Sequence, residues 1–184
     1  MSAPDPTDSA LVLRVLDGDG DAFGVLVARH HARCLRLAIH VLGSREDAED
    51  AVQETFLRAY RSLGTYEDRD RFGGWLARIL VNQCRTALTR RARSAETVAD
   101  WEWSAAPDGV TEHPADRAAL REELQRALAA LDPAQREAVV LKFADDMTYD
   151  EISAVTGASV SALKMRVQRA CRRLRALLGE SAHA

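Results

Sequence analysis

Apolar and basic residues in the last third of the chain follow the period of an α-helix. When each residue advances by about 100°, one narrow stripe collects Leu163, Val167, Ala170, Leu174, Leu177 and Leu178, and the opposite side collects Lys164, Arg166, Arg169, Arg172, Arg173 and Arg175. No acidic residue occurs between positions 157 and 178. This pattern predicts a helix that packs one face on a small core and presents cations outward, an arrangement suited to phosphate contacts with DNA.

The segment before this helix carries the signals of a shorter helix and a tight turn. Thr148 and Glu151 have the spacing of a capping box. Gly157 then ends the short helix, because glycine tolerates the left-handed conformation common at helix C-termini. Ser159 or Ser161 can cap the next helix. Two helices around a short glycine turn are the DNA-binding helix-turn-helix pattern, although an ordinary helical hairpin with a solvated basic face also fits this segment.

The rest of the chain is also predicted to be helical. Periodicity and turn residues predict helices over 9–17, 22–42, 44–63, 75–93, 120–131 and 134–143, with a charged loop over 64–74. The helix over 44–63 has an inward apolar stripe and an acidic outer face, on which Leu57 is surrounded by polar residues. The helix over 75–93 carries five arginines and no acidic residue. Because alternating β-branched runs are few, the predicted fold class is all-α.

Charge divides the chain into three parts. Residues 94–116 carry six acidic and no basic side chains, together with serine, proline and glycine, which is the composition of a flexible linker. We therefore expect two small helical domains, over 9–93 and 117–179, joined by this acidic linker, with the helix-turn-helix in the second domain. The overall net charge of −3 conceals this segregation.

Cysteine content and hydropathy limit the remaining classes. Cys34, Cys84 and Cys171 lie in separate segments without a C-x-x-C pair, so we expect three reduced, half-buried thiols. No stretch approaches the roughly 20 apolar residues of a membrane span, and the polar, acidic start lacks the features of a signal peptide. We therefore expect a cytoplasmic protein without membrane insertion. No nucleophile–base pair or metal-ligand set is recognised, so the sequence predicts neither an enzyme nor a cofactor.

Two blocks of sequence resemble conserved regions of bacterial RNA polymerase sigma factors. The run from Asp47 to Tyr60 (DAEDAVQETFLRAY) resembles the second region of these proteins, and the run from Trp75 to Asn82 (WLARILVN) resembles its promoter-melting segment. Leu131 to Arg136 (LDPAQR), with 149–152 and 164–170, resembles the fourth region. Both blocks occur in the family order with only a short linker between them, which is typical of the extracytoplasmic-function (ECF) group.

The resemblance implies a role for each block. Binding to core RNA polymerase is implied for the acidic outer face, at Asp47, Asp50, Gln53, Glu54 and Leu57. Recognition and melting of the start-proximal (−10) promoter element is implied for Tyr66, Trp75, Arg78, Asn82, Arg85, Arg90 and Arg91, with Tyr66 and Asn82 in a pocket for a flipped base. Reading of the distal (−35) element is implied for Ser161, Lys164, Arg166, Arg169, Arg172 and Arg173. An anti-sigma factor is a further implied partner.

The sequence departs from the usual family pattern at Thr86, Ala162, Met165 and Cys171. Ala162 lacks the hydroxyl found at that position in many relatives, so no phosphate contact is carried over there. None of these changes falls in the apolar stripe, so the predicted fold is unaffected.

Two other functions stay open at this point. A stand-alone helix-turn-helix regulator with an effector-binding N-terminal domain explains residues 148–178, but it leaves the blocks at 47–60 and 75–82 unexplained. A sigma mimic that only titrates a regulator predicts binding to polymerase or to an anti-sigma factor without transcription. The first alternative predicts tight binding to free operator DNA, and the sigma-factor interpretation predicts promoter binding that depends on core polymerase.

Overall fold

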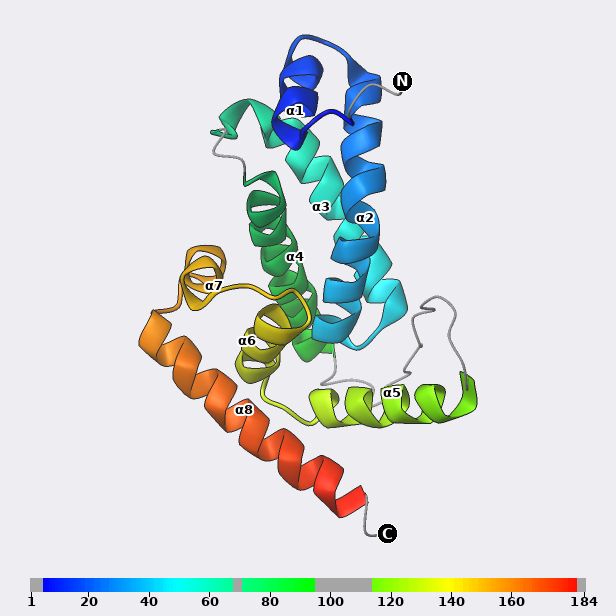
Figure 1. The fold of residues 1–184 in the computed structure, drawn as a ribbon, viewed down its shortest axis with the longest axis vertical. Helices are drawn as coiled ribbons and strands as arrows, with labels where there is room; N and C mark the ends of the chain where they lie inside the picture. The colour runs from blue at the N-terminus through cyan, green and yellow to red at the C-terminus, as the bar shows by residue number, and fades with distance from the viewer. Residues whose placement is uncertain (1–4, 68–70, 95–113, 182–184) are drawn as a thin grey trace.

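The computed structural model of the chain describes residues 5–67, 71–94 and 114–181. Within those ranges the chain forms helices and no strand (Figure 1). The elements are α1 (Asp8–Leu16), α2 (Gly20–Leu42), α3 (Arg45–Ser62), a short 3-10 turn η1 (Leu63–Thr65), α4 (Phe72–Ser94), α5 (Pro114–Ala129), α6 (Pro133–Phe143), α7 (Tyr149–Thr156) and α8 (Val160–Ser181). The all-α prediction is confirmed.

Polar side chains fix where most of these helices begin. A side-chain oxygen accepts a hydrogen bond from a first-turn backbone N–H at each of six N-caps, which are Thr7, Asp19, Ser44, Asp132, Thr148 and Ser159. Such a cap contributes about 1 kcal/mol to helix stability. Gly43 and Gly157, with φ of 72° and 73°, end α2 and α7 in the left-handed conformation. Because these capping signals are local, most helix ends predicted from the sequence lie within a few residues of the observed ends.

The first four helices surround one apolar core. α2, α3 and α4 pack against one another, and α1 packs on α2 (Figure 1). Leu26 and Ile39 of α2 and Phe72, Leu76 and Leu80 of α4 are almost completely buried there. Burial of such side chains contributes roughly 1.5–3 kcal/mol each. This core holds the outer faces of α3 and α4 in fixed positions.

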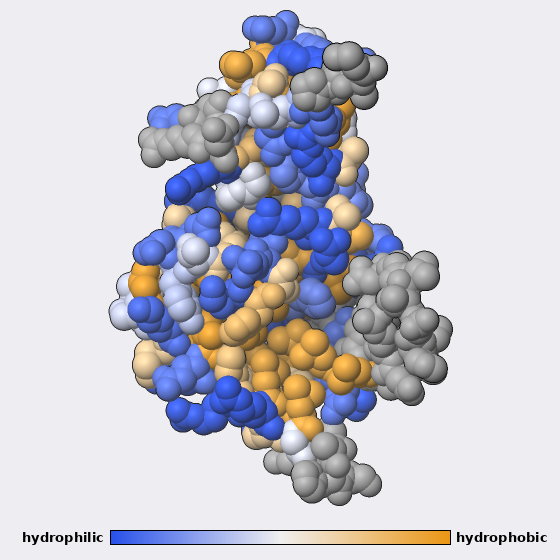
Figure 2. All heavy atoms as spheres, viewed as in Figure 1, coloured by the Kyte–Doolittle hydropathy of each residue, from blue (hydrophilic) through white to orange (hydrophobic). Residues whose placement is uncertain are grey.

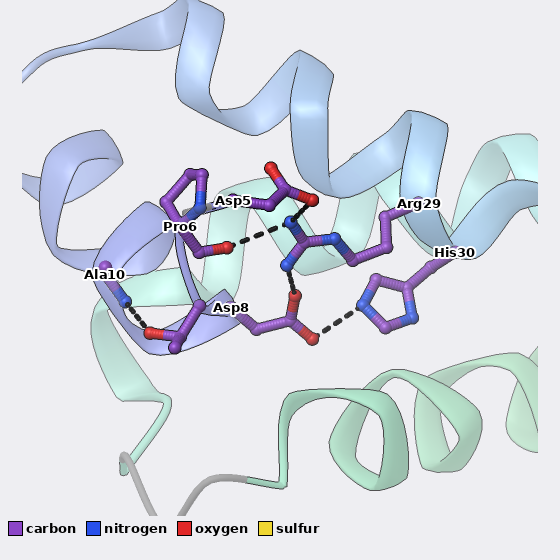
Figure 3. A network of polar contacts seen from close by, with 7 residues as sticks. Asp5, Pro6, Asp8, Ala10, Arg29 and His30 are labelled. Atoms are coloured by element: carbon purple, nitrogen blue, oxygen red, sulfur yellow. Dashed lines mark hydrogen bonds and ion pairs between the residues drawn. The ribbon is translucent and has the colours of Figure 1, made fainter. Parts of the chain in front are cut away.

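The segment before α1 is tied to α2 by a network of polar contacts (Figure 3). The Arg29 guanidinium donates to the Asp5 and Asp8 carboxylates and to the Pro6 carbonyl. Asp8 also contacts His30 Nε2 at 2.8 Å. These contacts fix the start of α1 against the middle of α2.

In the second half of the chain, α5–α8, a buried arginine joins α6 to the end of α5. Arg136 of α6 is 5% exposed, and its guanidinium donates to the carbonyls of Leu128, Ala129 and Leu131 at the end of α5. A fourth bond, at 3.2 Å, reaches the Val41 carbonyl near the end of α2. Burial, with the neighbouring charge of Arg91, holds the pKa of Arg136 below its ordinary value. Arg136 therefore satisfies helix-end carbonyls in both halves of the molecule.

The two halves pack directly on each other. α7 packs against α4, and α6 packs against α2 (Figure 1). Buried residues of both halves form one continuous hydrophobic cluster, which includes Leu37 and Val41 of α2 and Val139 and Val140 of α6. The sequence predicted two domains but gave no indication of this contact.

Some boundaries differ from the sequence prediction. α4 begins at Phe72, so Gly73 and Gly74 lie in its first turn and not in the preceding loop. α5 begins at Pro114, inside the segment expected to be a linker over 94–116. Residues 95–113, the rest of that segment, lie outside the described residues. Among the described residues, no helix is long and apolar enough to span a bilayer.

Candidate nucleic-acid and partner interfaces

α7, the turn and α8 form the helix-turn-helix that the sequence predicted. Thr148 and Glu151 make the reciprocal capping box, with the Thr148 N–H 2.7 Å from Glu151 Oε2. These bonds from the Thr148 backbone and hydroxyl hold the pKa of Glu151 below its ordinary value. Ser159, and not Ser161, caps α8, by accepting from the Ala162 N–H at 3.3 Å. Gly157 and Ser159 therefore define the two ends of the turn between α7 and α8.

α8 has one buried and one basic face. Leu163, Val167 and Ala170 are at most 5% exposed, as their stripe predicted. On the other side, Arg166 is half-buried, and the exposed cations are Lys164, Arg169, Arg172, Arg173 and Arg175. Ser161 is exposed in the first turn, with its hydroxyl 3.2 Å from that of Ser159. The early residues of such a helix are the ones that reach base edges in a major groove.

Two further residues join this basic face from outside α8. Tyr149, at the start of α7, lies between two lysines, with Lys142 Nζ 5.5 Å and Lys164 Nζ 5.9 Å from its ring centroid. Lys142 also donates to the Met147 carbonyl at 3.0 Å. Neither Lys142 nor Tyr149 could be assigned to this face from the sequence, because both lie outside the helical periodicity of α8.

Aromatic side chains cluster at the start of α4. The ring centroids of Tyr66, Phe72 and Trp75 lie 5.2–5.7 Å apart, and His30 of α2 lies 5.3 Å from Phe72. Tyr66 and Trp75 are half-buried. Their partial exposure leaves ring surface available for stacking, which is how proteins bind unpaired bases.

Asn82 lies in a different feature, an open groove between α3 and α4 with a volume of about 500 Å³. Ile79, Ser62, Arg58 and Arg61 line the groove with it. Tyr66, which was assigned with Asn82 to one flipped-base pocket, is not among the residues that line this groove. Arg58 and Arg61 were not among the predicted site residues, because helical periodicity within α3 does not show that these two side chains face Asn82 of α4.

The arginines of α4 have different surroundings. Arg78 and Arg90 are exposed. Arg91 Nη1 lies 3.6 Å from Asp47 Oδ2, so a candidate DNA contact pairs with a candidate polymerase contact. Arg85 reaches across to the second half of the chain, where its Nη2 lies 2.7 Å from Glu137 Oε1. This carboxylate raises the pKa of Arg85.

The acidic face of α3 borders an apolar groove. Asp50 and Gln53 are exposed, Asp47 and Glu54 are partly buried, and Glu54 pairs with Arg58 at 2.7 Å. Leu57 is 45% exposed. Its neighbours in a groove of about 490 Å³ include Phe23 and Val27 of α2 and Phe56 and Tyr60 of α3. The sequence predicted that Leu57 is surrounded by polar residues, and this is wrong. Phe23 and Val27 of α2 lie beside it, and the sequence of α3 alone cannot reveal these neighbours.

A second apolar surface lies on the α5–α8 half. Figure 2 shows apolar atoms gathered over the lower part of the molecule, where α5, α6 and α8 approach one another. Among the leucines of these helices, Leu120 and Leu124 of α5 are exposed, and Leu177 and Leu178 of α8 are half-buried. Contiguous apolar surface rimmed by charge is typical of protein–protein contact sites.

The cysteines differ from the expected half-buried thiols. Cys34 and Cys84 are buried, and only Cys171 is half-buried. Burial raises the pKa of Cys34 and of Cys84 to about 12. Both side chains therefore stay protonated at neutral pH, and the thiolate that reacts with electrophiles is nearly absent.

Alkylation with iodoacetamide at about pH 8 should therefore modify Cys171 first. Cys34 and Cys84 should react only after denaturant unfolds the chain, because the protonated thiol is a poor nucleophile and both sites are closed to reagent. Peptide mass spectrometry over a time course measures the three rates separately. Equal rates in the native protein would contradict this packing of α2 and α4.

Comparison with known proteins places these surfaces in a family context. Residues 26–94 match the family model for sigma-70 region 2, and residues 121–174 match that for sigma-70 region 4. The RNA polymerase sigma factor CarQ of Myxococcus xanthus is 40% identical over 167 residues, which cover 91% of this chain and 95% of CarQ. The ECF RNA polymerase sigma factor SigM of Mycobacterium tuberculosis is 35% identical, with 94% of this chain and 85% of SigM covered.

Two solved structures share the fold. CnrH in complex with the cytosolic domain of CnrY is 32% identical, with a TM-score of 0.68, and the match covers 94% of this chain and 97% of CnrH. The sigma factor RpoE in complex with the anti-sigma factor NepR from Bartonella quintana is 26% identical, with a TM-score of 0.72 and coverage of 85% and 96%. The similarity therefore extends over both halves of the chain.

Proposed function

The chain belongs to the ECF group of the sigma-70 family, and from that premise we propose which of its surfaces performs each part of promoter-specific transcription initiation. A sigma factor is a transcription initiation factor that directs core RNA polymerase to promoters. The observation that carries this conclusion is that regions 2 and 4 match in order on one chain whose fold is also that of solved sigma factors.

We assign the work to two domains, residues 9–93 and 117–179. The first domain would bind core polymerase and the melted start-proximal element, and the second would read the distal element. The two family-model matches, over residues 26–94 and 121–174, support this division. Because core polymerase acts on the chromosome, the assignment also places the protein in the cytoplasm.

The basic face of α8 fits the distal element. Lys164, Arg166 and Arg169 lie early in the helix, where side chains reach bases, whereas Arg172 and Arg173 lie further along and suit phosphate contacts. Ser161, exposed in the first turn, suits a phosphate contact as well. This division assigns sequence choice to the first half of α8 and general affinity to the second half.

Arg166→Ala should lower affinity for the distal element and relax sequence choice. The expected loss is about 1–3 kcal/mol if Arg166 contacts a base with both ends of its guanidinium. Arg172→Ala should weaken binding to all sequences about equally, because a phosphate contact carries no sequence information. Binding to a library of distal-element variants, measured with holoenzyme, separates the two effects. A larger change in preference for Arg172→Ala than for Arg166→Ala would mean that the proposed register of α8 is wrong.

The α4 side of the first domain fits the single-stranded start-proximal element. Trp75 and Tyr66 supply stacking surface at the start of α4. Arg78, one turn further on, and Arg90 and Arg91, near the end of α4, supply positive charge along the helix. Asn82, in its groove, supplies an amide that can hydrogen-bond to the edge of an unstacked base. We also assign Arg85 of α4 to the start-proximal element, although its guanidinium contacts Glu137 of α6 in this structure.

The α3 surface fits a protein partner. Asp47, Asp50, Gln53 and Glu54 give it negative charge, and the groove beside Leu57 gives it apolar area. Charge around an apolar centre is the usual composition of a protein interface. We therefore assign core polymerase to this surface.

An anti-sigma factor is the proposed regulator. Two similar sigma factors were solved in complexes, CnrH with the cytosolic domain of CnrY and RpoE with the anti-sigma factor NepR. The apolar surface around Leu120 and Leu124 offers such a partner a site on the second domain.

A gel-shift assay with and without core polymerase tests this function. A sigma factor should shift promoter fragments only when core polymerase is present. A stand-alone regulator, the alternative function, would shift its operator without polymerase, and a sigma mimic would bind core polymerase but produce no transcript in a run-off assay. Either of those outcomes would overturn the proposal.

A further inference from the structure

Two ion pairs join the first domain to the second, and we propose that they form a latch that withholds the promoter-binding face from DNA in the free protein. The latch consists of Arg33 and Arg85 from the first domain and Asp145 and Glu137 from the second. This inference rests on the proposed function in one respect, which is the assignment of Arg85 to the start-proximal element.

Both pairs are two-pronged. Arg85 Nε and Nη2 donate to the two oxygens of Glu137 at 2.8 Å and 2.7 Å. Arg33 Nε and Nη2 donate to the two oxygens of Asp145, in the loop between α6 and α7, at 2.6 Å and 2.9 Å. Arg85 Nη1 also donates to the Thr156 carbonyl at the end of α7, at 3.2 Å. All three guanidinium nitrogens of Arg85 are thus directed toward the second domain.

Glu137 occupies the place of a DNA phosphate in this arrangement. A carboxylate and a phosphate both present two oxygens that match the guanidinium fork. Because the fork of Arg85 is already filled by Glu137, the side chain must leave that carboxylate before it can make the same contact with a phosphate. Closure therefore competes directly with promoter binding at this position.

The burial of the four groups indicates which side moves away on opening. The side chains of Glu137 and Asp145 are only 7% and 5% exposed, whereas those of Arg85 and Arg33 are 40% and 44% exposed. The carboxylates are therefore built into the second domain, and the arginines reach into it from the edge of the first. On opening, the arginines become fully hydrated and available, and the carboxylates gain water in their place.

The energetics of such pairs suit reversible closure. Burying an ion pair costs nearly as much desolvation as the Coulomb attraction returns, so these pairs fix the register of the domains more than they add stability. The apolar contact between α2 and α6 and the bond from Arg136 to the Val41 carbonyl supply the attraction. Interfaces between domains of one chain commonly allow the domains to move. We therefore expect the contact between the two domains to open when core polymerase or DNA competes for the residues that form it.

Arg33→Glu tests the latch without changing a residue assigned to DNA or polymerase. The variant sets a glutamate against Asp145, so the closed form is destabilised by like-charge repulsion. Arg36→Glu is the matched control, because Arg36 is an exposed arginine of the same helix and the net charge changes equally. Small-angle X-ray scattering of the full chain reports the separation of the domains, and circular dichroism checks that each variant is folded.

Binding of a labelled random-sequence single-stranded DNA pool, followed by anisotropy, reports access to the promoter-binding face. Arg33→Glu should increase the radius of gyration and tighten DNA binding by at least about threefold, because apparent affinity scales with the open fraction. Arg36→Glu should leave the radius unchanged and weaken binding slightly. A second route to opening is Asp145→Asn, with the exposed neighbour Asp146→Asn as its control; it keeps the inference testable if Arg33→Glu does not fold.

An unchanged radius of gyration in both opening variants would overturn the latch. Expansion without tighter DNA binding would overturn the claim that closure withholds the promoter-binding face. A separate experiment tests the assignment of Arg85 to the start-proximal element. It measures run-off transcription by holoenzyme that contains the Arg85→Ala variant. If that holoenzyme transcribes like the wild type, Arg85 is not a promoter contact, whatever the scattering shows about closure.

Discussion

Reversing the charges of Asp50 and Glu54 to lysine should weaken binding to core RNA polymerase by at least about tenfold, or roughly 1.4 kcal/mol. Both residues belong to the acidic face of α3, and Asp50 is exposed there. Neither belongs to the apolar core, so helicity should not change. The pair Asp17→Lys and Asp21→Lys is the matched control, because these exposed carboxylates near the start of α2 carry the same charge and do not line the groove beside Leu57.

Leu57→Ala completes this test, because it removes the apolar part of the same surface and changes no charge. Leu57 is 45% exposed, so its truncation should leave the free energy of unfolding nearly unchanged while weakening polymerase binding. Titration of labelled core polymerase with each variant gives the dissociation constants. If the double charge reversal and Leu57→Ala both bind like the wild type, the polymerase surface lies elsewhere on the chain.

The largest effect on stability should come from Arg136→Ala. The substitution removes a donor from four backbone carbonyls, and only the Leu128 carbonyl keeps another, the Leu131 N–H at 3.1 Å. An unsatisfied buried acceptor costs about 1–3 kcal/mol, and partial hydration of the sites will recover some of that. We expect a loss of roughly 3 kcal/mol, which lowers Tm by about 10 °C in a chain of this size.

Thermal unfolding followed by circular dichroism measures this loss. Arg126→Ala provides the comparison, since Arg126 is an exposed arginine of α5 and its loss should change Tm by no more than a degree or two. Arg136→Lys should also be destabilising, because a single ammonium cannot reach all the carbonyls that the guanidinium fork reaches. If the Tm of Arg136→Ala equals that of the wild type, the hydrogen bonds of Arg136 contribute little to stability.

Local sequence signals predicted the local structure well. Thr148, Glu151 and Gly157 define both ends of α7 through contacts within a few residues, so their spacing alone located the helix-turn-helix. The buried stripe of α8 follows from helical periodicity for the same reason. Asp132 before Pro133 likewise marked the start of α6.

Contacts between distant residues were beyond the same reasoning. Arg85 and Glu137 are 52 positions apart, and no pattern in either helix shows that the two side chains meet. Arg136 was noted only as part of a family-like motif, and its four carbonyl partners became evident with the packing of α5, α6 and α2. Leu57 gained its apolar neighbours from α2 in the same way.

Run-off transcription tests the central claim most directly. Purified protein, core RNA polymerase and genomic fragments are combined, and the 5′ ends of the transcripts are mapped. The account predicts discrete start sites that appear only when both components are present, with the sequences upstream of them sharing a distal and a start-proximal element. Transcripts that are absent or unchanged on adding the protein, although it binds core polymerase, would contradict the assignment as a promoter-specificity factor.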